Sequence, residues 1–235
     1  MNIFEKIVAS SFMINVRDSL AYYGLRTERT TNLIRSLEYL NWLNMGDREK
    51  FEGDFLEFGV ASGQFIARAF IAAKRFKQLD SMRFFGFDSF EGLPETQSEF
   101  DPLSAFKKDA FAYSTGKVEK NLKKVGLGND KLKLIKGFYN ETLKKSPLFY
   151  GIKKIAYVHI DCDLYDSTIG ALDFVKNNLV NGAILDFDDY FCYESDNYGE
   201  PKALMDFIKH NREMSVRQFS RYGPFSITFT ITRNV

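Results

Sequence analysis

Short apolar runs alternate with amphipathic stretches from residue 54 onward, and this alternation predicts a mostly parallel β-sheet with helices on both faces. Each expected strand is a run of apolar or alternating residues with turn residues at its ends. The expected strands cover residues 55–58, 83–88, 131–136, 154–160 and 183–187. The expected helices cover residues 63–78, 167–179 and 201–211, and Asn181-Gly182 is expected to close the second of these.

The two ends of the chain depart from this alternation. Residues 1–50 are predicted to be helical and to form a cap on the main fold, with the last helix starting at Thr27 as its N-cap and ending at Gly46-Asp47. Residues 215–221 and 225–232 are predicted to pair as a C-terminal antiparallel hairpin. A length of 235 residues suits one large α/β domain, so residues 1–235 are expected to form a single domain.

The segment from Gly92 to Lys117 is too long for an ordinary connection between a strand and a helix. It contains prolines and several aromatic residues, with polar residues between them. Two interpretations stay open. Residues 93–114 form a lid over the functional site, or the segment is a packed excursion on the surface.

Composition narrows the classes of function. The formal net charge of +1 and the scattered basic residues indicate no nucleic-acid partner. No apolar run approaches the roughly 18 residues that span a membrane, and the N-terminus has no signal-peptide pattern, so a cytoplasmic protein is expected. Cys162 and Cys192 form no Cys-x-x-Cys pattern. Free thiols are therefore expected, while a disulfide between them stays open.

Two acidic segments, residues 159–166 (HIDCDLYD) and 185–190 (LDFDDY), follow or end apolar strands. In a parallel sheet these strands end at the same edge, so their carboxylates are expected to converge. Like charges in a cleft are costly, and a divalent cation would relieve that cost. Asp166 or Ser167 is expected to cap the helix that begins at residue 167, and Asp186 is expected to point to the other face of its strand. Neither aspartate is therefore assigned to the cation site.

A glycine turn, Gly59-Val60-Ala61-Ser62-Gly63, joins the first predicted strand to the following helix. Glycine lets a ligand approach the backbone closely, and the start of a helix offers unpaired amide donors. The turn matches neither the dinucleotide fingerprint nor the P-loop.

Asp88 ends the second strand, where an acidic residue can bind ribose hydroxyls or cap the next turn. Together with the glycine turn, ribose binding is favoured.

Five segments, in order from about residue 54 to 210, resemble the macrocin O-methyltransferase family of class I S-adenosylmethionine-dependent methyltransferases. The segments are 57–60 (EFGV), 86–94 (GFDSFEGLP), 136–143 (KGFYNETL), 159–168 (HIDCDLYDST) and 187–190 (FDDY). The second and fourth segments are the ones specific to that family.

The resemblance implies a Rossmann-like α/β fold with a seven-stranded sheet. It also implies methyl transfer from S-adenosylmethionine to a hydroxyl group, notably on sugars of natural products, with Mg²⁺. The implied cofactor residues are Glu57, Gly59 and Gly63 at the methionine end, Asp88 and Ser89 at the ribose and adenosine, and Gly137 and Phe138 at the adenine. The implied metal ligands are Asp161, Asp188 and Asp189.

A metal also suits the chemistry, because an aliphatic hydroxyl holds its proton tightly and a divalent cation acidifies and orients it. The catalytic candidates are Asp161, Asp163 and His159. Asp163 is interpreted as a base or as a carboxylate that supports a metal ligand. For His159, which shares a strand face with Asp161, a core or supporting role is favoured over a catalytic one. Leu164 stands where related catechol-type methyltransferases place a lysine base, so the identity of the base stays open.

Two other functions stay open. Asp161-Cys162-Asp163 has the Asp-x-Asp form in which metal-dependent glycosyltransferases hold a nucleotide sugar, but that function gives Asp88 and the glycine turn no role. In a non-catalytic scaffold without a cation, the clustered carboxylates of the two acidic segments would lower the stability of the fold. The expected partner is a small-molecule acceptor with a hydroxyl group, and the N-terminal helices are expected to be the surface through which a homo-oligomer would form.

Overall fold

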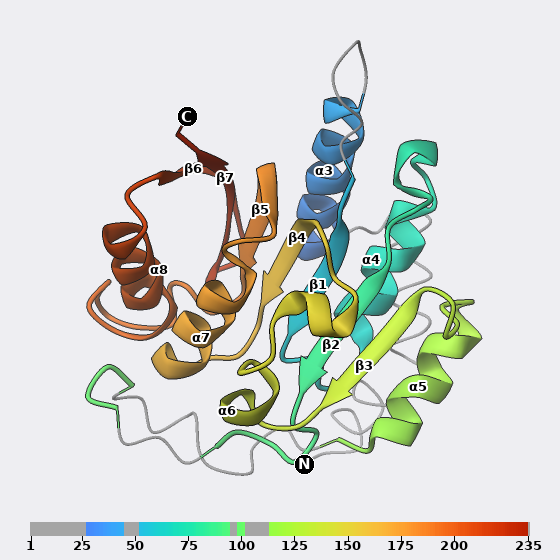
Figure 1. Cartoon of the computed structure of the whole chain (residues 1–235), viewed down its shortest axis with the longest axis horizontal. Coiled ribbons are helices and arrows are strands. Elements are labelled where there is room, and N and C mark those ends of the chain that lie inside the picture. The colour runs from blue at the N-terminus through green and yellow to red at the C-terminus, as the bar shows by residue number, and fades with distance from the viewer. Residues whose placement is uncertain (1–26, 45–51, 95–97, 102–112, 235) are drawn as a thin grey trace.

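The computed structural model describes residues 27–44, 52–94, 98–101 and 113–234, which form a seven-stranded sheet with helices on both faces (Figure 1). The strands are β1 (Asp54–Phe58), β2 (Phe84–Asp88), β3 (Leu132–Lys136), β4 (Ile155–Ile160), β5 (Leu179–Phe187), β6 (Met214–Tyr222) and β7 (Ser226–Arg233). They lie in the order β3-β2-β1-β4-β5-β7-β6. Strands β1 to β5 pair in parallel, and β7 is antiparallel to β5 and β6. The predicted parallel sheet with a C-terminal hairpin is confirmed.

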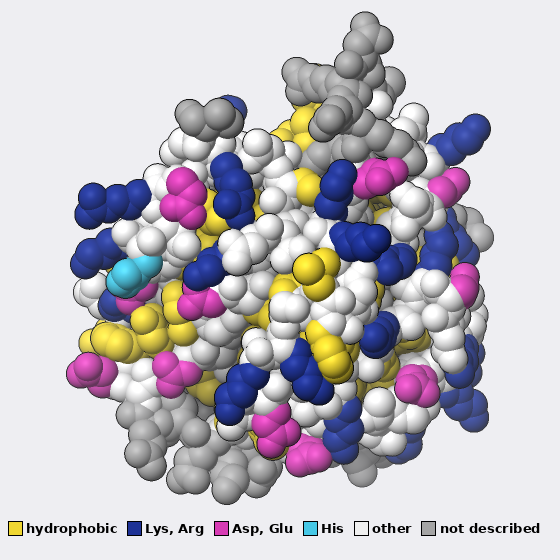
Figure 2. All heavy atoms as spheres, in the orientation of Figure 1, with side chains coloured by type: hydrophobic (Ala, Val, Ile, Leu, Met, Phe, Trp, Pro, Cys, Tyr) yellow, Lys and Arg dark blue, Asp and Glu magenta, His cyan; other side chains and the backbone are white. Residues whose placement is uncertain are grey.

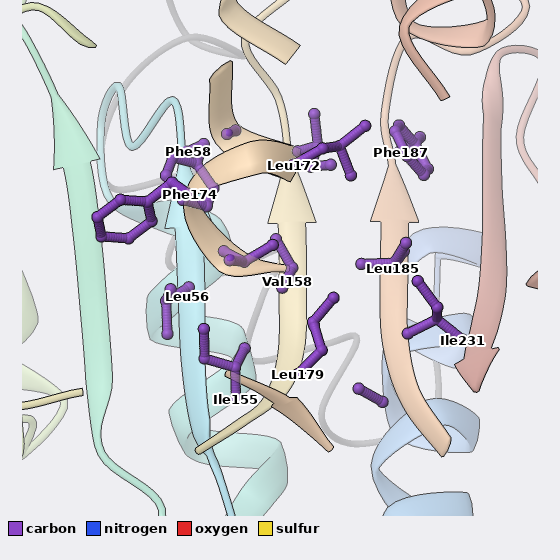
Figure 3. Packing of buried hydrophobic residues seen from close by; sticks show 14 of the residues in the cluster. Leu56, Phe58, Ile155, Val158, Leu172, Phe174, Leu179, Leu185, Phe187 and Ile231 are labelled. Atoms are coloured by element: carbon purple, nitrogen blue, oxygen red, sulfur yellow. The ribbon is translucent and has the colours of Figure 1, made fainter. Parts of the chain in front are cut away.

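Apolar cores fill both faces of the sheet. The helices are α3 (Glu28–Leu43), α4 (Gln64–Ala73), α5 (Thr115–Lys124), α6 (Tyr139–Thr142), α7 (Tyr165–Val175) and α8 (Gly199–His210), with 3-10 turns η1 (Lys77–Leu79) and η2 (Pro147–Tyr150). One core lies beneath α7 and α8, where Leu172 and Phe174 contact the sheet (Figure 3). The other lies beneath α3, α4 and α5. Strands β1, β4 and β5 contribute to both cores, so β1 and β4 are buried along their whole length and β5 is buried from residue 182 to residue 187.

Several predicted element boundaries are wrong. Helix α4 ends at Ala73, followed by η1, where the pattern predicted a helix to residue 78. Helix α3 ends at Leu43 with Asn44 as its C-cap, whereas Gly46 and Asp47 lie outside the described residues. Strand β5 begins at Leu179, so Asn181-Gly182 lies within a strand and does not close a helix. The N-cap at Thr27 is confirmed, because its side chain accepts a hydrogen bond from Thr30 N at 3.2 Å.

Helix α7 begins at Tyr165, two residues before the predicted start, because its first amide is capped from elsewhere. Asp101 accepts a hydrogen bond from Tyr165 N at 2.8 Å, although the two residues are far apart in sequence. The local N-cap residue, Leu164, has no side chain that could do this. The predicted cap by Asp166 or Ser167 is therefore wrong, and Asp166 lies in the first turn of α7.

Two other predictions fall mainly on residues that the structure does not describe. The helical cap was predicted over residues 1–50, of which residues 1–26 are outside the described ranges, as is most of the 93–114 segment. The lid and the N-terminal oligomer surface therefore stay predictions. On the face seen in Figure 2, basic and acidic side chains are interspersed. Among the described helices, none has the length and apolar character to cross a membrane.

The parallel register brings four strand ends to one edge of the sheet. Phe58 at the end of β1 is level with Phe87 in β2 and Ile160 in β4, and Ile160 is level with Phe187 in β5. The residues that follow, Gly59, Asp88, Asp161 and Asp188, therefore form a row along this edge. This row is where ligands of open α/β sheets bind.

Gly59 is required at this edge because two chain segments meet there. A β-carbon at Gly59 would lie 1.7 Å from the carbonyl oxygen of Asp161, and its φ of +90° disfavours any side chain. The Gly59→Ala substitution is expected to lower the free energy of unfolding by about 3 kcal/mol or more, through overpacking and backbone strain. Chemical denaturation measures this change.

Gly116, in α5, is the matched control, because a β-carbon there would meet nothing within 4 Å. Gly116→Ala is expected to be neutral or to stabilise by up to about 1 kcal/mol. A Gly59→Ala protein as stable as the wild type would show that the two segments can separate without cost.

Candidate active site

The sheet edge opens into a cavity of about 710 Å³, a size suited to a cofactor and a small substrate. Nine of the predicted site residues line it: Glu57, Gly59, Asp88, Ser89, Phe138, Asp161, Asp163, Asp188 and Asp189. Gly63, Gly137 and His159 are not among the lining residues. Most of the predicted binding residues are thus brought together in one place.

The glycine turn forms one wall of the cavity and is tied to Asp88. Asp88 Oδ2 accepts a hydrogen bond from Ala61 N at 2.8 Å, and Oδ1 accepts one from Phe90 N at 2.5 Å. Burial raises the pKa of Asp88, and the backbone donors partly offset this effect. Gly63, with φ of +79°, is the N-cap of α4 and ends the turn. Asp88 therefore caps its own turn and also fixes the glycine turn beside the cavity.

The next part of the wall is built by the ends of β2 and β3. Ser89 Oγ donates to Gly92 O at 2.8 Å, which closes the turn after β2. Gly137 N donates to Asp88 O at 3.0 Å and continues the pairing of β2 with β3 beyond the strand. Phe138, the N-cap of α6, faces the cavity at this point. The wall is therefore apolar here and polar at Asp88.

Glu57 places an unsatisfied carboxylate in the cavity wall. Its side chain is 1% exposed, and its Oε2 has no hydrogen-bond partner within the described part of the chain. Burial raises the pKa of Glu57 to about 8, although the positive charges of His159 and Arg29 oppose this rise. Because buried polar atoms are almost always partnered, this oxygen indicates a cationic or donor group on a ligand.

Three carboxylates converge on the other side of the cavity. Asp161, Asp163 and Asp189 each offer an oxygen, and these atoms all lie within 4.8 Å of one another. Asp163 is buried with a positive φ of 61°, a strained conformation that is typical of functional sites. Burial, together with the neighbouring Asp189, raises the pKa of Asp163 to about 9. Such crowding suits a divalent cation with oxygen ligands.

Asp188, which the resemblance assigns to the metal, lies next to this cluster but has other partners. Ser226 Oγ donates to its Oδ1 at 3.1 Å, and Arg29 Nη2 lies 2.7 Å from its Oδ2. Burial raises the pKa of Asp188 to about 6, and Asp161 adds to the rise while Arg29 opposes it. Asp161 and Asp189 are thus common to the predicted ligand set and the observed cluster, and Asp163 takes the third place.

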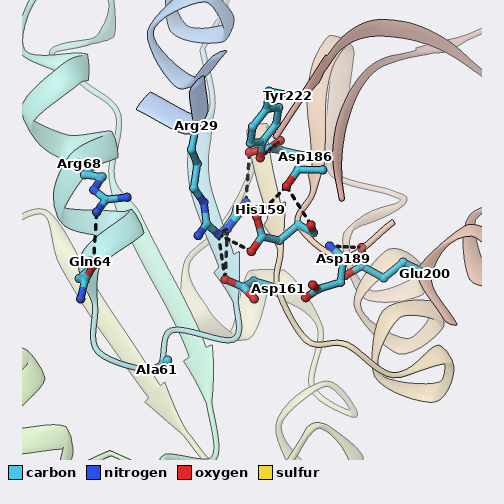
Figure 4. A network of polar contacts seen from close by, with 12 residues as sticks. Arg29, Ala61, Gln64, Arg68, His159, Asp161, Asp186, Asp189, Glu200 and Tyr222 are labelled. Atoms are coloured by element: carbon cyan, nitrogen blue, oxygen red, sulfur yellow. Dashed lines mark hydrogen bonds and ion pairs between the residues drawn. The ribbon is translucent and has the colours of Figure 1, made fainter. Parts of the chain in front are cut away.

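Arg29 was missed by the sequence analysis, although it lines the cavity. It lies in the first turn of α3, and its Nη2 also contacts Asp161 Oδ2 at 3.1 Å (Figure 4). One signal in the sequence could have found it. A positive charge in the first turn of a helix opposes the helix dipole, so a basic residue just after the Thr27 N-cap needs another reason to be there.

Behind the cavity, His159 and Asp186 form a buried network. Asp186, fully buried, accepts hydrogen bonds from Tyr157 OH at 2.7 Å, Tyr222 OH at 2.9 Å, Thr228 Oγ1 at 2.9 Å and His159 Nδ1 at 3.1 Å. Burial alone would raise the pKa of Asp186, but the bond to His159 and the hydroxyl donors hold it below its usual value. Asp186 does not line the cavity, and through His159 its carboxylate is connected to Asp161.

His159 links this network to the cavity. Its ring stacks on Phe65 with centroids 3.5 Å apart, and its Nε2 lies 3.6 Å from Asp161 Oδ2. Burial opposes a charged ring, yet Asp161 and Asp186 outweigh this effect and raise the pKa of His159 to about 10. His159 is fully buried, so it supports Asp161 from behind and does not face the cavity.

The two cysteines are free, as expected, and one of them contacts the carboxylate cluster. Cys192 Sγ donates to Asp189 Oδ1 at 3.0 Å, and Asp189 N donates to Glu200 Oε2 at 3.1 Å. Glu200 is fully buried, and burial raises its pKa well above the usual value. Asp189 is therefore held in place through both its backbone and its side chain.

Removing the Asp186 carboxylate is expected to destabilise the fold strongly. Asp186→Ala leaves buried hydroxyls and the His159 ring without an acceptor, which should cost about 3–5 kcal/mol in the free energy of unfolding. Asp173→Ala is the control, since Asp173 is exposed and its ion pair in the described part of the chain is with Lys176 at 3.0 Å, and it should cost less than about 1 kcal/mol. Equal stability of the two variants in chemical denaturation would contradict the structural role of Asp186.

Comparison with known proteins gives one family and a consistent fold. The family model described as Macrocin-O-methyltransferase (TylF) matches residues 15–213. A tetracenomycin-related rhamnosyl 4'-O-methyltransferase from Streptomyces olivaceus is 28% identical over 145 residues, which cover 59% of this chain and 53% of the relative. Mycinamicin III 3''-O-methyltransferase from Micromonospora griseorubida is 23% identical over 192 residues, which cover 78% of this chain and 73% of the relative. The first alignment therefore spans about half of that relative's length.

Solved structures share the fold. The O-methyltransferase NovP superimposes with a TM-score of 0.71 at 20% identity, covering 89% of this chain and 81% of NovP. The calicheamicin methyltransferase CalS11 superimposes with a TM-score of 0.69 at 21% identity, covering 97% of this chain and 89% of CalS11. The seven-stranded sheet is thus that of the Rossmann-like class I methyltransferases.

Proposed function

Because the chain belongs to the macrocin O-methyltransferase family, we propose that it transfers the methyl group of S-adenosylmethionine to a hydroxyl group of a small molecule, with the help of a divalent cation. One observation carries this proposal. A single cavity has the unpartnered Glu57 carboxylate and Asp88 on one side and the cluster of Asp161, Asp163 and Asp189 on the other. The cavity therefore offers a place for a methyl donor beside a place for a cation.

The residues on the first side fit S-adenosylmethionine, which supplies an electrophilic methyl group on a positively charged sulfur. Glu57 would accept the α-ammonium group of its methionine part, which gives the orphaned Oε2 a partner. Asp88 would bind the ribose hydroxyls, with Gly59 and the turn that ends at Gly63 close to the ligand backbone. Phe138, with Ser89 and Gly137 nearby, would contact the adenine and adenosine.

The residues on the second side fit a divalent cation such as Mg²⁺, which would acidify and orient an acceptor hydroxyl. Asp161 and Asp189 are the proposed ligands, with Asp163 completing the cluster and Asp188 paired to Arg29. Asp163 is also the proposed proton acceptor, because its carboxylate lies beside those of Asp161 and Asp189, where the acceptor hydroxyl would be held. His159 positions Asp161 and is not proposed to contact the acceptor.

The proposed acceptor is a sugar or a natural-product glycoside. One relative is named as a methyltransferase of a rhamnosyl-tetracenomycin and the other as a methyltransferase of mycinamicin III, and the cavity of about 710 Å³ has room for a small acceptor beside the cofactor. The glycosyltransferase alternative is disfavoured, since a nucleotide sugar would leave Glu57 and the glycine turn without a role. Free thiols at Cys162 and Cys192 support a reducing compartment, and we propose the cytoplasm.

The pH dependence of cofactor binding is expected to report on Glu57. The ionised carboxylate pairs with an ammonium group, and its pKa of about 8 in the free protein means that binding at lower pH must first remove a proton. The affinity for S-adenosylhomocysteine should therefore rise with pH up to about pH 8, by at most about tenfold per pH unit. Calorimetry at several pH values measures this dependence.

Glu57→Gln is the matched variant, because it keeps the shape of the side chain but cannot titrate. It is expected to bind S-adenosylhomocysteine more weakly and without this pH dependence. A wild-type affinity that stays constant between pH 6 and pH 8 would show that Glu57 does not receive the ammonium group.

Methyl transfer is expected to require the carboxylate cluster. A screen of hydroxylated sugars and glycosides, read by product mass, should find methylation that EDTA abolishes and Mg²⁺ restores. Asp189→Asn should lower turnover by about 10–100-fold while S-adenosylhomocysteine binding stays nearly unchanged. Asp196→Asn, an exposed aspartate in the same segment, should have little effect. An undiminished rate of methyl transfer in EDTA would show that the reaction does not need a divalent cation.

A further inference from the structure

The start of helix α3 is fixed to the C-terminal hairpin, and this places Arg29 at the cavity. Glu28 Oε2 accepts a hydrogen bond from Gly223 N at 2.7 Å, in the turn between β6 and β7. Asn32 Nδ2, one turn later, donates to Thr228 Oγ1 at 2.7 Å. Arg29 lies between these two anchors, so its backbone position is set by the hairpin and not by the carboxylates it touches.

A single nitrogen of Arg29 contacts both strand-end carboxylates. Nη2 lies 3.1 Å from Asp161 Oδ2 (Figure 4). The same nitrogen lies 2.7 Å from Asp188 Oδ2. The other oxygen of Asp188 already accepts a hydrogen bond from Ser226. Arg29 therefore occupies the point from which one cation would contact Asp161 and Asp188 together.

One donor of the guanidinium is unsatisfied by the described residues in this position. Its Nε is buried and has no hydrogen-bond partner among the described residues, although a guanidinium offers five donors. The group also lies over the ring of Phe65, with Cζ 5.0 Å from the ring centroid, and its side chain is 31% exposed. Its Nη2 also lies 3.3 Å from His159 Nε2, so Arg29 contacts two carboxylates and a histidine at the edge of the cavity.

We propose that Arg29 competes with the divalent cation for Asp161 and Asp188. This inference rests on the cation of the proposed function. While Arg29 holds these two oxygens, a divalent ion has only the remaining oxygen of Asp161 together with Asp163 and Asp189. When Arg29 withdraws, Asp188 becomes available as a further ligand. The wild-type chain therefore binds the ion more weakly than its carboxylates alone would.

Calorimetry with Mn²⁺, without cofactor or acceptor, tests this competition. Arg29→Gln removes the competing charge and should bind Mn²⁺ about tenfold more tightly or better than the wild type. Arg29→Lys keeps the charge and should stay within about threefold of the wild type. Arg35→Gln is the matched control, because Arg35 is exposed on the same helix and its loss changes the net charge equally. It should leave the affinity unchanged.

Unchanged or weaker Mn²⁺ binding by a folded Arg29→Gln protein, checked by circular dichroism, would overturn the competition. A gain of equal size in Arg29→Lys would overturn it as well, since the charge would then not be the cause. If Arg29→Gln does not fold, NMR of the wild-type arginine Nε–H signals replaces it. The Arg29 signal, identified by its loss in Arg29→Lys, should shift on addition of Mg²⁺, and a constant signal would contradict the proposal.

The proposed function can fail separately from this inference. Absence of Mn²⁺ binding in every variant would overturn both the competition and the cation of the proposed function, while binding of S-adenosylhomocysteine would still support methyl transfer. Equal Mn²⁺ binding by wild type and Arg29→Gln would overturn the competition alone.

Discussion

The repulsion between carboxylates at the ends of β4 and β5 is the constraint on which the rest of the site depends. The parallel register puts Asp161 and Asp188 side by side, and the turns that follow add Asp163 and Asp189. Positive charge must compensate this group. The chain supplies part of it from Arg29 and from His159, which Asp186 holds in place from behind. The remainder of the negative charge is what the proposed cation would neutralise.

This constraint also explains why the N-terminal and C-terminal additions to the sheet matter for function. The hairpin of β6 and β7 supplies Tyr222 and Thr228 to Asp186 and Ser226 to Asp188. The same hairpin anchors α3, which carries Arg29 to the strand ends. The N-terminal helix and the C-terminal hairpin, which the sequence indicates only as a cap and a strand pair, therefore help to build the candidate active site.

Much of the fold and of the site could be predicted because the signals are local. Apolar runs mark the strands, and a strand that ends in Asp88 or Asp161 delivers that residue to the sheet edge. The rest depends on contacts between distant segments. Asp101 caps α7 from outside the local sequence, and Arg29 reaches Asp188 across most of the chain. The pairing of Asp188 with Arg29, which leaves Asp163 beside Asp161 and Asp189, is such a long-range contact, so no local pattern could reveal it.

The most direct test of the account is a crystal structure with S-adenosylhomocysteine and Mn²⁺, in which anomalous scattering locates the metal. We expect the cofactor's ammonium group at Glu57 and its ribose at Asp88, with the manganese peak bonded to Asp161 and Asp189 next to the cofactor sulfur. A cofactor bound outside this cavity, or a manganese peak away from both aspartates, would contradict the claim that one sheet edge holds the methyl donor and the cation together.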